Sequence, residues 1–237
     1  MFNWFGKISL IALILISFNS MLGDLLFRVK YSFPKATVIE QVIDISKEPV
    51  QINLQDAKYI KYRGEKDLYA LKPQAEYSIS ALVVAKNSNF WFRDIMRSKF
   101  DDVALLDLGL VWGDLASDKK ELYSHIKFNS KKTLGQARML YYRWDGTSPW
   151  GKDYITSHIA HTHMIPANPN VMGGLLQIKK NDVVKIDGYL VDIYTDKSEL
   201  VAYTSMSRSD TNASSRGSGA CEDMYVTQVQ IGNKIYR

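Results

Sequence analysis

The longest apolar run of the chain lies near its N-terminus. Residues 8–18 (ISLIALILISF) are apolar except for two serines, and Lys7 is the only charged residue between Phe2 and Leu22. A helix needs about 20 apolar residues to cross the hydrocarbon core of a bilayer. A lysine close to the end of such a helix can extend to the headgroups. The pattern therefore predicts an uncleaved membrane helix.

Two alternatives to this anchor stay open. A positive residue followed by an apolar stretch of about 7–15 residues is also typical of a cleaved secretory signal. The small-x-small cleavage pattern is poor, because Phe18 and Met21 stand at the position three residues before the candidate sites. The third possibility is a helix buried in the core of the protein.

The distribution of basic residues bears on the orientation of this helix. Lys7 precedes the span, and Arg28, Lys30 and Lys35 follow it. By the positive-inside rule the C-terminal side would stay in the cytoplasm. A short N-terminal tail with one lysine and a long polar domain is, however, the usual layout of an exported protein. We expect export.

From Ala36 onward the pattern changes to the two-residue period of β-strands. Apolar and polar residues alternate, or β-branched residues cluster, in several runs: 37–39, 42–45, 50–54, 76–84, 139–144, 183–191 and 224–231. Gly188 interrupts one run where a barrel strand would bend. Short helices are predicted at 118–126, capped by Ser117, and at 168–178, capped by Asn168.

These patterns divide the chain into three parts. Residues 1–27 form the anchor or signal, 28–35 a connector, and 36–237 a mostly-β extracytoplasmic domain. The fold class is α+β, with an N-terminal transmembrane helix followed by one mostly-β domain that carries a few short helices.

Composition narrows the class of protein without naming its chemistry. Hydrophobic residues make up 46% of the 237 and charged residues 23%, which excludes wholesale disorder. The single cysteine excludes an internal disulfide framework. A net charge of +5 is too small to indicate nucleic-acid binding by itself.

The histidines are the first candidates for chemistry. His158, His161 and His163 lie within six residues, and His161 and His163 would share one face of a strand. Together with Cys221 they could supply the ligands of a zinc ion. Ordinary strand and loop histidines are the expected alternative, so we expect no metal and no cofactor.

Cys221 is the second candidate. It follows a loop of small residues and could act as a nucleophile with His163 as base, oriented by Glu222 or Asp210. A small buried side chain at the entry to a strand is the usual fate of a free cysteine, and we expect that structural role. We also expect His163 and the stretch 208–222 to meet in space.

Other charged residues carry weaker hypotheses. The carboxylates Asp101, Asp102, Asp107 and Asp114 could serve a hydrolase, but solvated turn residues are the expectation. Arg138 and Arg143 alternate with aromatic residues, as in some single-strand nucleic-acid sites. A half-exposed strand is expected instead, with no nucleic acid as partner.

A series of short motifs resembles a family of uncharacterised bacterial proteins with an N-terminal membrane segment. It spans roughly residues 70–231 and includes HMIPAN at 163–168, NDVV and GYLV within 181–191, SRSDT at 207–211 and GACE at 219–222. Six residues fall on motif positions of the family: His158, His163, Arg208, Asp210, Cys221 and Glu222. His161 stands where the family tends to have another residue, which weakens the zinc hypothesis.

The resemblance implies a bacterial envelope protein of unassigned activity. We expect a single-pass protein of the bacterial inner membrane, with its C-terminal domain in the periplasm. The expected function is non-enzymatic binding of an envelope protein or a small ligand, with His158, His163, Asn168, Arg208 and Asp210 as binding residues. The alternative is a thiol-dependent hydrolase or transferase that uses Cys221 and His163.

Overall fold

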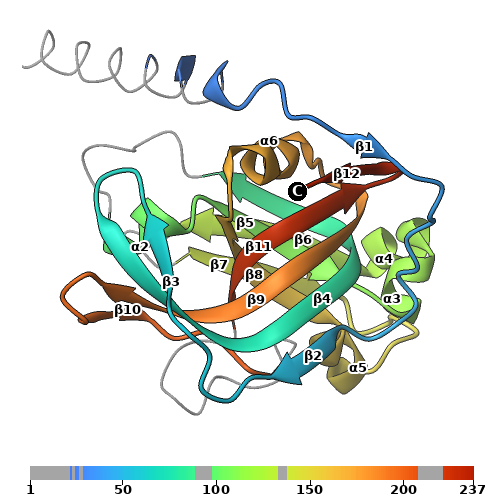
Figure 1. Cartoon of the computed structure of the whole chain (residues 1–237). Coiled ribbons are helices and arrows are strands. Elements are labelled where there is room, and N and C mark those ends of the chain that lie inside the picture. The colour runs from blue at the N-terminus through green and yellow to red at the C-terminus, as the bar shows by residue number, and fades with distance from the viewer. Residues whose placement is uncertain (1–21, 23–24, 27–28, 89–97, 133–137, 208–220) are drawn as a thin grey trace, which may run out of the picture.

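A computed structural model describes residues 22, 25–26, 29–88, 98–132, 138–207 and 221–237. Its centre is a barrel of five strands (Figure 1). They are β4 (Leu68–Ser88), β5 (Leu106–Val111), β8 (Ile159–Pro166), β9 (Val183–Thr195) and β11 (Glu222–Ile231). The mostly-β domain predicted from the sequence is therefore confirmed.

The strands follow each other around the barrel in the order β4-β5-β8-β11-β9, and β9 closes the barrel by pairing with β4. All neighbours are antiparallel except β8 and β11, which are parallel. Helix α6 (Pro169–Gln177) connects the third barrel strand to the fourth. This strand order and helix position are those of the OB-fold, a small Greek-key barrel.

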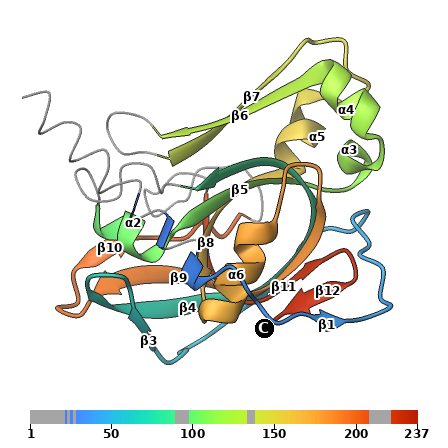
Figure 2. The same cartoon turned by 90° about the horizontal axis from the view of Figure 1, so that it is seen from above.

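Shorter elements extend the sheet and cover its outside. β2 (Val50–Asn53) and β3 (Ile60–Arg63) pair with β4, β10 (Leu200–Ala202) pairs with β9, and β12 (Lys234–Tyr236) lies between β11 and β1 (Thr37–Val38). A separate hairpin, β6 (Ile126–Lys132) and β7 (Arg138–Trp144), lies beside β5 in the view from above (Figure 2). The short helices are α2 (Lys99–Val103), α3 (Asp114–Ser117), α4 (Lys119–His125) and α5 (Lys152–Ser157).

Alternation along β5 separates the inside of the barrel from its outside. Leu106, Leu108 and Leu110 belong to the main core, with side chains from β4, β9, β11 and α6. Asp107 and Gly109 point the other way, since successive side chains of a strand face opposite sides. Gly109 leaves room for Leu140 of β7, which a Cβ would approach to 2.9 Å. The hairpin therefore covers the outer face of β5.

Gly188 occupies the position in β9 that the sequence pattern singles out. A Cβ at this residue would overlap the carbonyl oxygen of Tyr225 in the neighbouring strand. The pairing of β9 with β11 shifts register beside it, between Val226 and Gln228. Glycine is required here because two backbones approach closely.

The predicted local elements agree with the structure in part. Asn168 caps α6 as expected, because its side-chain oxygen accepts hydrogen bonds from Asn170 N and Val171 N. Helix α4, however, is capped by Asp118 and not by Ser117. The expected strand at 42–45 is irregular, because Asp44 accepts two hydrogen bonds from Ser46 and forms a local turn instead of a ladder.

The predicted membrane helix falls on residues 1–27, nearly all of which lie outside the described part of the chain. Within the described ranges, no helix combines the length and the apolar character needed to cross a bilayer.

Candidate functional site

A group of polar side chains lies on the outer face of three adjacent barrel strands. In the pairing of β5, β8 and β11, Asp107, His163 and Asp223 stand side by side in one row. Gly109 and His161 form the next row, and Cys221 directly precedes β11. The four polar strand residues are at most 6% exposed, although the outside of a barrel normally faces water. This group is called the Cys–His cluster below.

Cys221 and His161 are in direct contact. The distance from Cys221 Sγ to His161 Nδ1 is 3.1 Å. His161 is 1% exposed, whereas Cys221 is partly exposed, which differs from the burial expected for it. Burial, and secondarily the neighbouring His163, lower the pKa of His161 to about 3. Its imidazole is therefore neutral at physiological pH.

His163 is oriented by a carboxylate. Its Nδ1 lies 2.7 Å from Asp107 Oδ1, and its ring packs edge-to-face against that of His161 at 4.7 Å between centroids. Burial lowers the pKa of His163, and Asp107 opposes that shift. Ring nitrogens of both histidines and the sulfur of Cys221 all lie within 4.8 Å of one another. The structure thus brings His163 and Cys221 together, as expected from the sequence.

Arg138 closes the cluster from the hairpin side. Its guanidinium lies 3.3 Å from Asp107 Oδ1 and 3.6 Å from Asp101 Oδ1, and it donates to the carbonyl oxygen of Ala104 at 2.6 Å. The ring of Phe100 packs against the guanidinium. Burial by itself would raise the pKa of Asp107, but Arg138 and His163 hold it below its ordinary value. Asp107 is therefore an anion at the base of the cluster.

Asp223 adds a second carboxyl group beside His163. It is 3% exposed, and its Oδ1 accepts no hydrogen bond from the residues that the structure describes. Burial raises its pKa well above the ordinary value, with Asp192 and Asp107 acting in the same direction and Arg138 against it.

Glu222, one of the two expected orienting residues, points away from the cluster. Glu222 is fully buried and lies on the same face of β11 as Met224 and Val226, which belong to the main core. Its side chain therefore points into the barrel. There Thr162 donates to it at 3.5 Å. Asp210 lies outside the described residues, as does the binding candidate Arg208. The carboxylate that holds His163 is Asp107.

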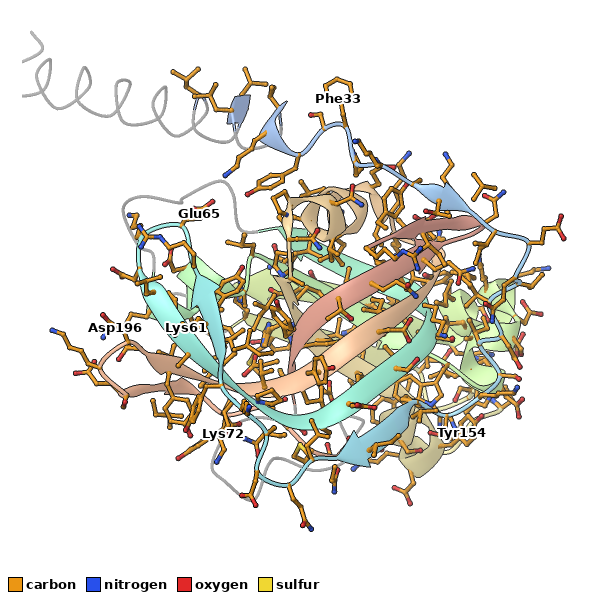
Figure 3. The ribbon with its side chains drawn as sticks, viewed as in Figure 1. Phe33, Lys61, Glu65, Lys72, Tyr154 and Asp196 are labelled. Atoms are coloured by element: carbon orange, nitrogen blue, oxygen red, sulfur yellow. The ribbon has the colours of Figure 1, made fainter. Side chains whose placement is uncertain are left out.

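The other two binding candidates lie away from the cluster. His158 stacks on Tyr154 of α5, which is labelled in Figure 3, and its Nε2 lies 3.0 Å from Glu48 Oε1. Four residues of β8 lie between it and His163, which places the two Cα atoms roughly 16 Å apart, so His158 cannot share a metal ion with that histidine. Asn168 uses its side-chain oxygen to cap α6.

The expectation of solvated acidic residues is wrong for three of the four, whereas the half-exposed strand expected around Arg138 and Arg143 is confirmed by the alternating burial of β7. Asp101, Asp102 and Asp107 are buried, and only Asp114 is the solvated residue expected. Arg138 lies on the buried side of that strand, where it is 4% exposed and forms ion pairs with Asp101 and Asp107. The sequence does carry a signal for Asp107: a charged residue inside the apolar run LDLGLV needs a buried partner.

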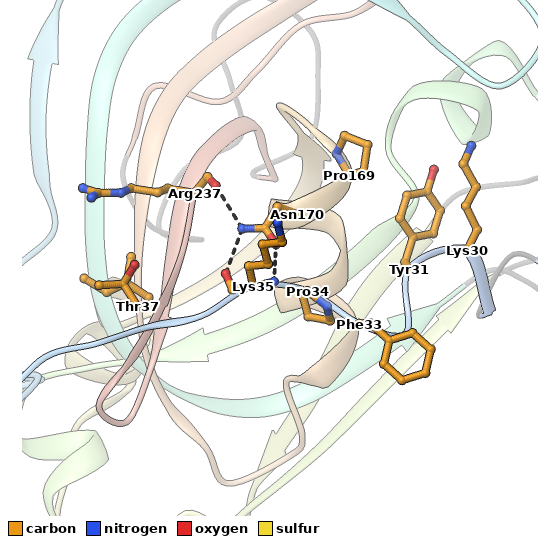
Figure 4. A pocket seen from close by; sticks show the side chains of 10 residues that line it. Lys30, Tyr31, Phe33, Pro34, Lys35, Thr37, Pro169, Asn170 and Arg237 are labelled. Atoms are coloured by element: carbon orange, nitrogen blue, oxygen red, sulfur yellow. Dashed lines mark hydrogen bonds between the residues drawn. The ribbon is translucent and has the colours of Figure 1, made fainter.

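A hollow of about 580 Å³ lies away from the Cys–His cluster, where the N-terminal segment passes α6 (Figure 4). Asn170 ties the segment down, since it accepts from Lys35 N at 2.6 Å and donates to Lys35 O and Arg237 O at 3.0 Å. Lys30 and Phe33 are among its lining residues, and Phe33 is 91% exposed.

The fold and the cluster together describe a small β-barrel protein that carries a cysteine and two histidines in contact on its outer face. The chain matches no protein-family model, no curated protein and no solved structure. The resemblance to bacterial envelope proteins therefore stays a prediction.

Proposed function

We propose that the protein is a thiol-dependent hydrolase or transferase whose nucleophile is Cys221. The observation that supports this proposal is the continuous contact from Cys221 through the two histidines to Asp107. A cysteine nucleophile needs a base within reach, and the base needs a group that orients it. The cluster supplies all three roles in one place. The expectation of a non-enzymatic binding domain stays untested.

His163 is the base in this proposal. With Nδ1 bound to Asp107, its other ring nitrogen is the one left to accept a proton. The Asp107 anion stabilises the imidazolium that forms, as the carboxylate of a catalytic triad does. His161, with a pKa of about 3, is too weak a base for this role. Its Nδ1 instead forms a hydrogen bond to the sulfur.

The proposed reaction is acyl transfer through a thioester. The proton of Cys221 passes to His163, and the sulfur bonds to the acyl carbon of the substrate. The leaving group departs with the proton held by His163. Water then cleaves the thioester in a hydrolase, or a second nucleophile accepts the acyl group in a transferase.

Iodoacetamide labelling of the full-length protein tests the proposal, because Cys221 is its only cysteine. We expect rapid alkylation at neutral pH in the presence of a chelator, and a rate at least about ten-fold lower in His163→Gln, since general-base assistance contributes about 10²–10⁴-fold. His125→Gln is the matched control, because His125 lies outside the cluster and contacts Glu121 of α4 and Asp145, the residue that follows β7. Slow labelling of the wild type, with no effect of His163→Gln, would favour the binding domain.

We further propose that residues 1–27 anchor this barrel to the bacterial inner membrane, with the barrel in the periplasm. The apolar run at 8–18 supports the anchor. Full-length protein should stay in the membrane pellet after carbonate extraction, and recovery in the soluble fraction contradicts the anchor. A periplasm-dependent reporter fused after Arg237 should be active, and activity of a cytoplasmic reporter alone reverses the orientation.

A further inference from the structure

We propose that His161, His163 and Cys221 bind a zinc ion that blocks the Cys221 thiol. The metal site itself is independent of the proposed function, whereas its inhibitory effect rests on that function. Two imidazole nitrogens and a thiolate are ligands that zinc prefers, and three protein ligands with an open fourth position are typical of reactive zinc sites.

The distances in the cluster fit this assignment. In a tetrahedral site, bonds of about 2.0–2.3 Å place neighbouring ligand atoms roughly 3.3–3.6 Å apart. Cys221 Sγ and His161 Nδ1 are 3.1 Å apart, and all three ligand atoms lie within 4.8 Å of one another. Side-chain rotation that closes the widest pair by at most about 1.5 Å completes the tetrahedral set.

The surroundings of the ligands supply independent support. Histidines that bind zinc almost always donate their other N–H to a carboxylate or carbonyl, which fixes the ring. His163 has that arrangement, because Asp107 holds its Nδ1 at 2.7 Å and leaves the second nitrogen for a metal. Asp223 lies beside His163 on the same face, and its buried Oδ1 accepts no hydrogen bond within the described part of the chain. A divalent cation would compensate this buried acidic group.

The origin of the ligands also favours a preformed site. His161 and His163 are two residues apart on β8, so the strand fixes them on one face. Cys221 directly precedes the neighbouring strand β11, whose first residues pair with Thr162 and His163. We assign zinc because a tetrahedral zinc site needs only these nitrogen and sulfur ligands and a water, whereas a His₂Cys copper site takes a further weak axial ligand; Cu²⁺ nevertheless binds such donors more tightly, so copper is included in the test.

Metal titration of the full-length protein is the direct test. We expect one Zn²⁺ per chain in a competition assay with a chromophoric chelator. Co²⁺ added to the wild type should produce thiolate-to-metal charge-transfer absorption, which needs no variant. His161→Asn and Cys221→Ser should weaken Zn²⁺ binding by a factor on the order of 10² or more, and Asp107→Asn by about 10–100-fold. His158→Asn, a histidine outside the cluster, should bind as the wild type does.

The outcomes separate this inference from the thiol-enzyme proposal. Protection of Cys221 from iodoacetamide by stoichiometric Zn²⁺ supports the metal site, even when labelling without metal is slow and the enzyme proposal fails. Rapid labelling without metal, together with no Zn²⁺ binding and no Co²⁺ charge-transfer band, overturns the metal site and leaves the enzyme proposal intact. Tight binding of copper in the absence of zinc binding also overturns the assignment. Equal weakening by His158→Asn and His161→Asn would overturn the assigned ligand set.

Discussion

Acidification should destabilise the protein through His161. This side chain is 1% exposed, and burial holds its pKa at about 3, compared with an ordinary value of 6.5. Between these two values the unfolded chain binds a proton and the folded chain does not, so the free energy of unfolding falls as the pH falls below 6.5. The stabilisation is fully present above that pH and is lost progressively as the pH approaches 3.

The magnitude follows from the two pKa values. From pH 7 to pH 5, protonation of one such histidine in the unfolded state lowers the free energy of unfolding by about 2 kcal/mol. At very low pH the loss of unfolding free energy from this histidine reaches its limit of about 5 kcal/mol. The pKa of His163 is lowered too, and that contribution has the same sign. It remains when His161 is replaced.

Urea denaturation at pH 7 and pH 5, with a chelator present, measures this term. Between pH 7 and pH 5 the free energy of unfolding should fall by about 2 kcal/mol less in His161→Asn than in the wild type, because asparagine does not titrate. His125→Asn serves as a control, since its histidine lies outside the buried cluster. Equal losses in the wild type and His161→Asn would mean that the folded protein does not keep this imidazole neutral, and the argument from burial would be refuted.

Two further substitutions, each with a matched control, test the packing around the barrel. Gly188→Ala should cost about 3 kcal/mol or more in thermal or urea unfolding, since its Cβ would overlap the backbone of Tyr225. Gly151→Ala, with no atom within 4 Å of the new Cβ, should cost under about 1 kcal/mol, and similar costs at both sites would contradict the close approach. Arg138→Met should cost about 3–5 kcal/mol, because it leaves buried carboxylates without their cation. Arg143→Met, on the exposed side of the same strand, should change stability by about 0.5 kcal/mol or less, and a small loss at Arg138 would mean that the buried pair contributes little.

Local sequence determined those features that depend on neighbours along the chain. The two-residue period predicts the strands at 183–191 and 224–231, and both are present within longer strands. Asn168 followed by proline predicts the start of α6, because the side chain and the ring act within one turn. The spacing of His161 and His163 predicts a common face, since alternation is a property of a single strand.

The composition of the cluster was decided by tertiary structure. Asp107 is 56 residues from His163 along the chain, and Arg138 contacts Ala104 across 34 residues. Such partners meet only because β5 and β8 pair and the hairpin folds over them. Local pattern carries no information on which strands become neighbours. The sequence pattern therefore left Asp107 among the solvated residues, and only the paired strands showed that it is buried with His163 and Arg138 as partners.

The contrast between Cys221 and Glu222 shows the same limit at single-residue scale. The two are adjacent in sequence, and their motif made both candidates for one site. Pairing of β11 with β8 places Glu222 beside Thr162 inside the barrel and leaves Cys221 in contact with His161 outside it. The sequence pattern predicted the strand only from residue 224 and left both residues as partners in one site, whereas the strand begins at Glu222 and alternation separates their side chains. Only closure of the barrel decided which face of the sheet carries the Cys–His cluster. The sheet has an inner and an outer face only after β9 pairs with β4.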